Sequence, residues 1–329
     1  INAYHKFIFL NPENADAYVN IGNVLQEQFK FDQAISSYNK AISLNPNSAQ
    51  AFYNLGTAQL ALHKIENAIE CYSKALSINP NYVQAHYNLG VALKDQGKFE
   101  DAITAYNKAI LLNPNYAQAY NNLGITLHIL GKLEDSVKAY DKAISLQPDY
   151  AEAYNNLGNT LHELGYLKDA VKAYKKAISI KPDCAESYNN LGKAYNNKNQ
   201  YDKTIEAYKK AILLKPDFAD AYINMGVTFH TQGKFDKAIC AYKKAISLEP
   251  DNADTYNKIG GAFYQKGMLE LSIVSFKKSI SLNPQCAETF NNLGIALKDE
   301  GKFKESITAY NKALILNPNY ANAHNNIGV

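Results

Sequence analysis

Apolar residues follow helical spacing in two neighbouring blocks of the segment 151–184, "AEAYNNLGNTLHELGYLKDAVKAYKKAISIKPDC". In the first block they recur at steps of three and four residues, at Tyr154, Leu157, Leu161 and Leu164. Gly165 interrupts this pattern, a second helical block follows, and Pro182 ends it. The segment is therefore predicted to form a helix, a tight turn and a second helix.

The same hairpin returns with a fixed period of 34 residues along the whole chain. A glycine in the first helix marks each copy, at Gly22, Gly56, Gly90, Gly124, Gly158, Gly192, Gly226, Gly260, Gly294 and Gly328. The period defines nine full repeats, 15–48, 49–82, 83–116, 117–150, 151–184, 185–218, 219–252, 253–286 and 287–320. Residues 1–14 are predicted to be the second-helix part of a preceding repeat, and 321–329 the start of a further one. One hairpin cannot bury its apolar faces alone, so the repeats are predicted to stack into an all-α solenoid.

Small residues explain how the two helices of a repeat come close together. Gly158 lies on the apolar face of the first helix, and Ala170 and Ala177 lie on that of the second. Without bulky side chains at these positions the helices can approach closely. Tyr154 and Tyr174 are predicted to fill the space between neighbouring repeats.

These residues resemble the tetratricopeptide repeat (TPR) family. The family pattern is matched by Tyr154, Leu157, Gly158, Leu161, Ala170, Tyr174, Ala177 and Pro182. The resemblance covers the whole chain and implies a right-handed superhelix whose first helices line a concave groove. The departures are Gln59 for the large apolar residue and, for the first alanine, Ser136, Thr204, Ser272 and Ser306. Phe29, His63 and Asn199 replace the turn glycine, so we expect those turns to be less sharp.

The two ends of the chain lack the polar capping repeats that a solenoid needs. The chain opens inside a second helix ("INAYHKFIFLNP") and closes inside a first helix ("ANAHNNIGV"). We therefore expect a piece of a longer array. Uncapped apolar ends also suggest, as a third hypothesis, a module that associates with itself.

Asparagines mark the polar side of the first helices, which the family resemblance places in the concave groove. The residue two before each repeat glycine is Asn20, Asn54, Asn88, Asn122, Asn156, Asn190, Asn224, Asn292 or Asn326, and Lys258 breaks the series. The preceding asparagine of "AYNNLG", Asn121, is also expected to point into the groove. Stacked helices lie roughly 8–10 Å apart and an extended chain advances about 3.4 Å per residue. One amide per repeat would thus meet every third residue of an extended peptide. The alternative is that each asparagine ties down a neighbouring helix or loop.

This series is similar to the asparagine ladder of O-linked N-acetylglucosamine transferases and the related SPINDLY proteins. The resemblance implies that these nine asparagines hold the backbone of client proteins. The main prediction is a non-catalytic scaffold that binds extended proteins or peptides. The alternative is the substrate-recognition region of such a glycosyltransferase, with its catalytic domain outside this chain.

Acidic residues occupy a second groove position in the later repeats, at Glu152, Glu186, Asp220, Asp254 and Glu288. The earlier repeats carry Gln50, Gln84 and Gln118 at the same place. Chaperone-binding members of the family clamp the C-terminal carboxylate of a ligand with cations of the groove. Those cations are missing at this position, so the resemblance does not extend to that binding mode. The later repeats are instead expected to prefer ligands that carry lysine or arginine.

Composition excludes several other classes of function. The net charge is only +3 and every strong cation is lysine, which argues against a nucleic acid or membrane partner. His128, His162 and His230 share one groove position, but neighbouring repeats are too far apart for a shared metal ion. No catalytic residue, metal site or cofactor is therefore predicted. Four scattered cysteines and the lack of an apolar span suggest a cytoplasmic protein.

Overall fold

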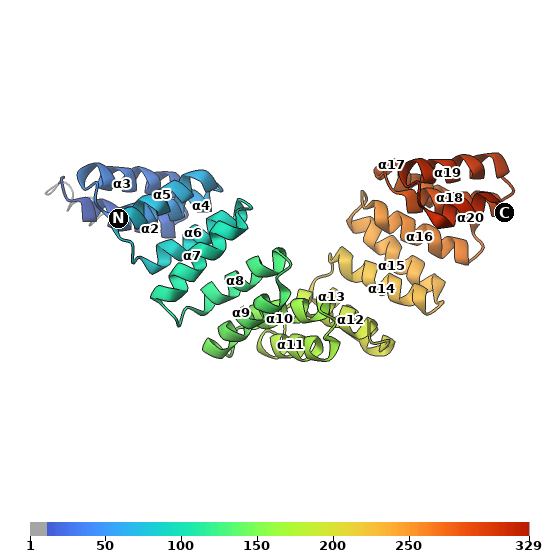
Figure 1. Ribbon diagram of the computed structural model, residues 1–329, viewed down its shortest axis with the longest axis horizontal. Helices are drawn as coiled ribbons and strands as arrows, with labels where there is room; N and C mark the ends of the chain where they lie inside the picture. The colour runs from blue at the N-terminus through green and yellow to red at the C-terminus, as the bar shows by residue number, and fades with distance from the viewer. Residues whose placement is uncertain (1–11, 329) are drawn as a thin grey trace. The chain divides into compact units, whose positions relative to one another are not determined.

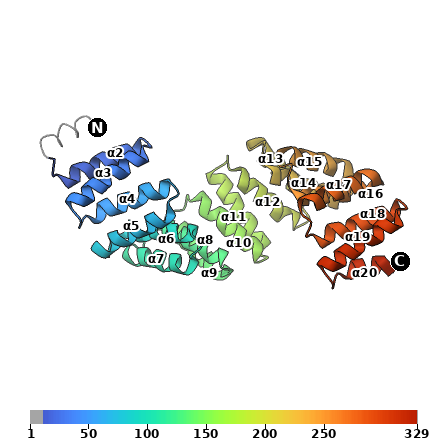
Figure 2. The ribbon, with the colours of Figure 1, turned by 90° about the horizontal axis from the view of Figure 1, so that it is seen from above.

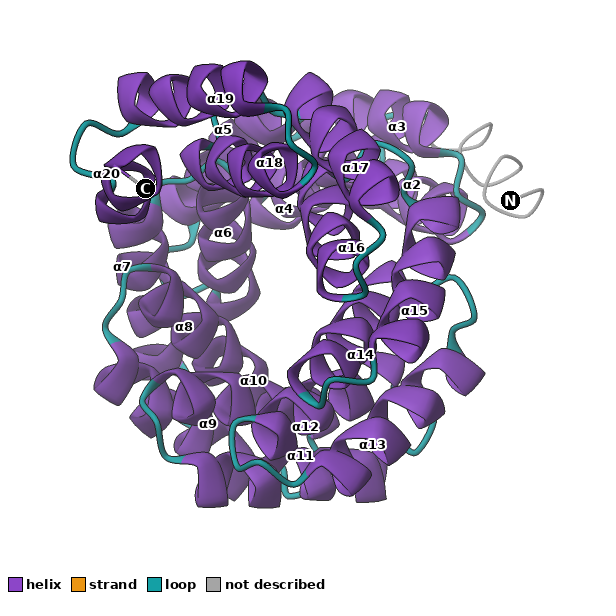
Figure 3. Cartoon of the chain, turned by 90° about the vertical axis from the view of Figure 1, so that its right-hand side faces the viewer, coloured by secondary structure: helices purple, strands orange, loops and turns teal. Residues whose placement is uncertain are grey.

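The computed structural model describes residues 12–328, in which all regular structure is α-helical (Figure 3). The predicted partial helix of residues 1–14 lies mostly outside the described residues. The chain divides into two compact units, Ile1–Gly165 and Tyr166–Val329, called here the N-terminal half and the C-terminal half. Helices follow one another in pairs along each half (Figures 1 and 2).

Each repeat contributes a first and a second helix with nearly constant lengths. The first helices are α2 (Ala15–Glu27), α4 (Ala49–Ala61), α6 (Val83–Asp95), α8 (Ala117–Ile129), α10 (Ala151–Glu163), α12 (Ala185–Asn196), α14 (Ala219–Thr231), α16 (Ala253–Gln265), α18 (Ala287–Asp299) and α20 (Ala321–Gly328). The second helices are α3 (Phe31–Leu44), α5 (Ile65–Ile78), α7 (Phe99–Leu112), α9 (Leu133–Leu146), α11 (Leu167–Ile180), α13 (Tyr201–Leu214), α15 (Phe235–Leu248), α17 (Leu269–Leu282) and α19 (Phe303–Leu316).

Proline sets the end of each second helix. In the first repeat α3 ends at Leu44, and Asn45 before Pro46 has left the helical region, at φ −135° and ψ 89°. The ring of a proline disfavours the helical conformation in the residue before it. The residue before a first helix can cap it when it is polar. Ser48, which precedes α4, accepts a hydrogen bond at its Oγ from the Ala51 N–H at 3.2 Å.

The turn between the helices of a repeat uses one residue in the left-handed conformation. Glycine fills this position in six repeats, for example Gly97 at φ 81°. Phe29, His63 and Asn199 adopt the same conformation, at φ 59°, 57° and 55°. The expectation of less sharp turns at these three residues was therefore wrong. The hairpin geometry is imposed by packing, and a non-glycine residue takes up the strain.

The repeat glycine lies directly under a buried tyrosine of the same hairpin. A Cβ atom on Gly90 would stand only 2.6 Å from Tyr106 Cε1. The Tyr106 side chain is fully buried, and so are its counterparts Tyr38 and Tyr72. This contact explains the glycine, since any larger residue would push the ring out. The tyrosine predicted to pack between repeats thus lies first of all inside its own repeat.

Stacking brings the first helices of successive repeats together. In the N-terminal half α2 contacts α4, α4 contacts α6, α6 contacts α8 and α8 contacts α10. In the C-terminal half α12, α14, α16, α18 and α20 form the same chain of contacts. Among the described residues, second helices of neighbouring repeats make no such contacts. Each half therefore curves with its first helices on the inner side, and the all-α solenoid of 34-residue hairpins is confirmed.

Candidate functional site

The nine predicted groove asparagines all lie on first helices, on the inner side of each half. Asn20 on α2 is exposed, and the other eight are half-buried. Their side chains do not simply project into solvent. Most of them donate a hydrogen bond to the preceding repeat.

The nine groove asparagines are called the ladder asparagines below. In the N-terminal half, the side-chain amides of three of them share one hydrogen-bond geometry. Asn88 Nδ2 donates to the Tyr53 hydroxyl at 3.1 Å, and Asn122 Nδ2 donates to the Tyr87 hydroxyl at 2.8 Å. Asn156 Nδ2 donates to Asn121 Oδ1 at 3.2 Å. In each case the acceptor lies 35 residues earlier, three residues before the glycine of the preceding repeat.

The C-terminal half repeats this bond with asparagine as the acceptor. Asn224 donates to Asn189 at 3.0 Å, Asn292 to Asn257 at 3.2 Å, and Asn326 to Asn291 at 2.9 Å. Asn190 is half-buried on α12 in the same register. The alternative interpretation, that each asparagine ties its repeat to a neighbour, therefore describes a real contact.

The acceptor position also explains where the ladder changes. Val19 occupies it ahead of Asn54, which donates instead to Asn23 Oδ1 at 2.8 Å. Ile223 occupies it ahead of Lys258, which forms an ion pair with Asp254 of its own helix. The asparagine series is interrupted at Lys258, whereas Asn54 keeps the asparagine and uses another acceptor of the preceding repeat. Sequence reasoning missed this pairing, although a comparison of positions 35 residues apart would have found it.

The prediction that Asn121 points into the groove was wrong. Its side chain is 1% exposed, because it lies between two repeats and accepts the hydrogen bond from Asn156. Asn189 and Asn291 are buried at the same place. The two asparagines of "NNLG" thus have different roles, with the first as a buried acceptor and the second as the donor.

Each of these ties uses an amide hydrogen of the donor asparagine and leaves the Oδ1 atom of that same asparagine out of the bond. Asn122 makes the point most clearly, since its Nδ2 also donates to the Gln118 carbonyl at 3.2 Å. Among the described residues, nothing donates to Oδ1 of Asn88, Asn122 or Asn156. A carboxamide oxygen accepts up to two hydrogen bonds. The inner side therefore presents a row of acceptors at the spacing of the repeats.

The five acidic residues predicted to line the groove are all exposed, but their surroundings differ. Asp254 is ion-paired with Lys258, and Glu186 lies 3.8 Å from Lys215 Nζ. Glu152, Asp220 and Glu288 have no ion-pair partner among the described residues, although Glu152 Oε1 accepts a hydrogen bond from Asn121 Nδ2 at 3.4 Å. The negative charge that could attract a ligand is therefore least compensated at these three positions.

The shared histidine position takes part in contacts between repeats. His128 Nδ1 lies 2.8 Å from Thr160 Oγ1, and its Nε2 lies 3.2 Å from Glu163 Oε2. Burial lowers the pKa of His230, whose ring packs edge-on against Phe235. No group of three side chains that could hold a metal ion occurs within residues 12–328.

Two tyrosine pairs lie beside the ladder in the N-terminal half. The rings of Tyr53 and Tyr82 have centroids 4.9 Å apart, and those of Tyr87 and Tyr116 repeat that distance. The first pair borders an open pocket of about 520 Å³ that also includes Gln50, Asn54 and Gln84. Sequence reasoning noted the glutamines but not the tyrosines.

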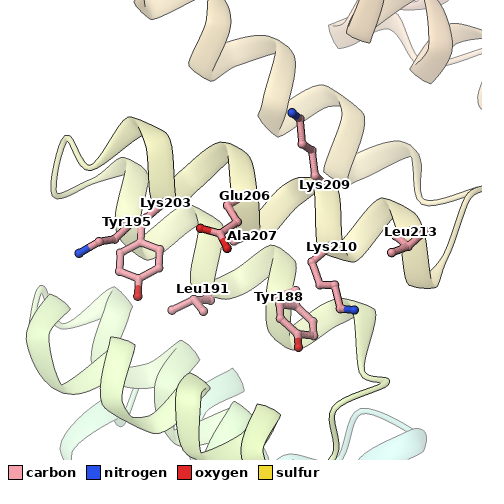
Figure 4. Close-up of a pocket in the computed structure, with 9 residues that line it drawn as sticks. All are labelled: Tyr188, Leu191, Tyr195, Lys203, Glu206, Ala207, Lys209, Lys210 and Leu213. Atoms are coloured by element: carbon pink, nitrogen blue, oxygen red, sulfur yellow. The ribbon is translucent and has the colours of Figure 1, made fainter.

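A second kind of hollow belongs to the fold itself. In the C-terminal half it is lined by Tyr188, Leu191 and Tyr195 of α12 together with residues of α13 (Figure 4). The same repeat positions line a hollow in the N-terminal half, where Phe52, Leu55 and Gln59 replace them. Because the hollow recurs between the two helices of a repeat whatever residues line it, it gives no sign of a dedicated ligand site.

The described helices are too short or too polar to cross a membrane. Stacked helical hairpins of constant length define the helical-repeat solenoids. Within that class, a family model described as TPR repeat matches residues 60–97, 92–131, 126–165, 158–198, 194–233, 229–267 and 296–329. Models described as tetratricopeptide repeat match residues 15–48, 37–70 and 253–286. The chain belongs to the tetratricopeptide repeat family.

Solved structures with this fold resemble the chain at low sequence identity. YrrB, described as a TPR protein with an unusual peptide-binding site, is 21% identical, with a TM-score of 0.50 over 59% of this chain and 100% of its own. Cut9–Hcn1 of the APC/C is 15% identical, with a TM-score of 0.59 over 99% of this chain and 80% of its own. PilF of Pseudomonas aeruginosa is 20% identical, with a TM-score of 0.57 over 63% of this chain and 94% of its own. These likenesses concern the fold alone. Comparison with curated proteins gave no match.

Proposed function

We propose that the chain is a non-catalytic scaffold that binds segments of other proteins in an extended conformation. The observation that supports this most directly is the row of amide oxygens on the inner side of each half. At Asn88, Asn122 and Asn156 the amide hydrogens are engaged with the preceding repeat, and nothing among the described residues donates to the three amide oxygens. An extended peptide carries unpaired N–H groups that fit such acceptors.

The ties between repeats support this role, because they fix each amide before a ligand arrives. A pre-organised side chain loses little rotamer freedom on binding. Structural tie and ligand contact are then two functions of one side chain, divided between its nitrogen and its oxygen. The finer features that we propose are the ladder contact itself, a preference for basic ligands near Glu152, Glu186, Asp220, Asp254 and Glu288, and self-association as an alternative.

A substrate-recognition role in a larger glycosyltransferase would use the same contact. The similarity of the asparagine series to the ladder of O-GlcNAc transferases is the observation that favours it. An acceptor contact to the ligand backbone is proposed in either case.

The experiment separates the two roles of one amide. Peptides selected from a random display library on the full chain are titrated against Asn122→Ala and against the control Tyr87→Phe. Tyr87→Phe removes the acceptor of the tie and leaves the ladder amide in place. We expect Asn122→Ala to weaken peptides that cross these repeats by about 1 kcal/mol, roughly fivefold, whereas Tyr87→Phe, which loses the tie but keeps the ring and the amide oxygen, should weaken them clearly less.

A second arm changes the ligand. Replacing a backbone amide of a selected peptide by an ester removes one N–H donor, and the loss should appear only at every third position of the peptide. If both variants lower stability but neither lowers affinity, and if esters bind like amides, the asparagines are structural and the ladder contact is wrong.

A further inference from the structure

The two tyrosine pairs of the N-terminal half are a local feature, not part of the repeat pattern. Each pair combines a residue of a first helix with the residue that precedes the next first helix, as in Tyr53 with Tyr82. Tyr87 and Tyr116 reproduce it one repeat later. At the following repeat the pattern stops, because Asn121 stands where a ring would face Tyr150.

All four rings of the two pairs are half-buried, and one ring of each pair is fixed by a hydrogen bond to its hydroxyl. Asn88 and Asn122 donate to the hydroxyls of Tyr53 and Tyr87, so the ladder positions those two rings. Tyr82 lies over Tyr53 at an interplanar angle of 38°. Tilted pairs of this kind leave ring faces and edges for a further flat or apolar group.

The surroundings of the first pair carry almost no charge. Its pocket is lined by amides and tyrosines, with Glu27 as the one charged residue. Gln50 and Gln84 occupy the positions that become acidic in the later repeats. A ligand for the first pair should therefore be uncharged where it meets the rings, unlike a ligand for the acidic positions of the C-terminal half. At the second pair the one charge of the described residues that acts on Tyr87 is that of Glu152.

The spacing of the pairs selects a backbone conformation. Each pair is one repeat from the next, and neighbouring first helices are roughly 8–10 Å apart. A polyproline II helix advances about 3.1 Å per residue with three residues per turn, or about 9 Å per turn. One side of such a helix would meet one tyrosine pair per turn. Proline favours this conformation, packs well on aromatic rings, and loses no N–H donor on binding because it has none.

We propose that the second to fourth repeats hold a subsite for an uncharged, proline-containing segment in the polyproline II conformation, with a proline about every third residue on each tyrosine pair. The residues between the prolines supply the N–H groups for the oxygens of Asn88 and Asn122. This proposal rests on the proposed peptide-binding function and names the ligand chemistry of one of its sites.

The test compares matched variants of the full chain. Tyr82→Ser with Tyr116→Ser removes the outer ring of both pairs, and Tyr150→Ser is the control at the same repeat position without a ring partner. Serine at this position is compatible with the fold, because Ser48 occupies it in the first repeat and caps α4. Circular dichroism of each variant verifies folding before titration.

The probes are a blocked (Pro-Ala-Gln)n peptide of about twelve residues, its Pro→Ala counterpart, a lysine-rich peptide of equal length, and a chitooligosaccharide. We expect calorimetry to show binding of the proline peptide, weakened on the order of tenfold by the double variant and unchanged by Tyr150→Ser. The alanine counterpart should bind at least fivefold more weakly. Equal binding of the two peptides, binding of the oligosaccharide alone, or equal loss in the control variant would overturn the proposal.

The same measurements distinguish a failure of the tyrosine subsite from a failure of the proposed peptide-binding function. The lysine-rich peptide reports on the acidic positions of the C-terminal half and should not respond to the tyrosine substitutions. If it binds while the proline peptide does not, the tyrosine subsite is wrong and peptide binding stands. If neither binds and the display library yields no peptide that the full chain binds, the peptide-binding function itself is wrong.

Discussion

The buried tyrosine under which the repeat glycine lies provides a sharp test of the packing, because its hydroxyl has a hydrogen-bond partner in some repeats and none in others. Tyr38 OH lies 2.9 Å from Asn23 Oδ1 and 3.2 Å from Gln26 Oε1. Tyr106 OH is equally buried but has no hydrogen-bond partner among the described residues, since Val91 stands in the place of Asn23. Burial raises the pKa of both phenols, so neither ionises near neutral pH.

We therefore predict opposite signs for the same substitution. An unpaired buried hydroxyl costs about 1–3 kcal/mol, and a typical satisfied one contributes about 1 kcal/mol. Tyr106→Phe keeps the ring over Gly90 and should raise local stability by about 1 kcal/mol. Tyr38→Phe removes the hydroxyl donor from the half-buried amide oxygens of Asn23 and Gln26, of which only Asn23 keeps another donor among the described residues, Asn54, and should lower it by about 1 kcal/mol. The chain contains a precedent, since Phe276 replaces tyrosine in the repeat where Gly261 offers no side chain.

Hydrogen exchange is the appropriate assay, because a repeat array does not unfold in one step and a single melting temperature would average over repeats. Protection of amides in α6 and α7 should rise in Tyr106→Phe, while that in α2 and α3 should fall in Tyr38→Phe. A loss of protection of similar size in both variants would refute the role assigned to Asn23 and Val91. The ring contact alone would then account for the tyrosine.

Other consequences can be measured in the same material. His63→Gly removes a left-handed non-glycine residue and should stabilise its hairpin by about 1 kcal/mol, visible as slower exchange in α4 and α5; faster exchange would show that the turn is not strained. Burial raises the pKa of Tyr72 and Tyr116 to about 12 from the ordinary value of 10.0, so stability should be constant below pH 10 and fall as pH rises toward 12. Parallel titration of tyrosinate absorbance and helicity tests this, and ionisation of the last tyrosines without loss of helix would contradict it. Asp220→Asn should weaken a lysine-rich peptide at low salt by about 0.2–1 kcal/mol, and Asp254→Asn by less, since Lys258 already neutralises Asp254; an equal loss in calorimetry would argue against the pairing.

The fold could be read from the sequence because its signals repeat. A glycine, a tyrosine and a proline in fixed register identify the two helices and the turn, and one hairpin predicts the rest. The register also placed the ladder asparagines correctly on the first helices. Their partners could not be assigned in the same way, since a helical wheel shows which side a residue occupies but not which residue of the next repeat it contacts.

The misjudged residues show the same limit. Asn121 was assigned to the groove because the wheel places it on the polar side, yet the next repeat covers it. Phe29 was expected to loosen its turn, yet the packing of two helices overrides its local preference. Both outcomes depend on contacts between segments, which the composition of one segment does not contain. The tyrosine pairs could not be predicted from the 34-residue period, because they occur in two repeats only and the period describes what all repeats share.

The interrupted ladder has a mechanical consequence in the C-terminal half. Ile223 gives the repeat 253–286 no buried acceptor, and an exposed ion pair between Lys266 and Asp236 links it to the preceding repeat. Amide ties are nearly insensitive to salt, whereas an exposed ion pair weakens as ions screen it. The contact between repeats 219–252 and 253–286 should therefore weaken more with ionic strength than the contacts that include an amide tie. Under a stretching force the half should yield first between α15 and α16, and at a lower force as salt is added.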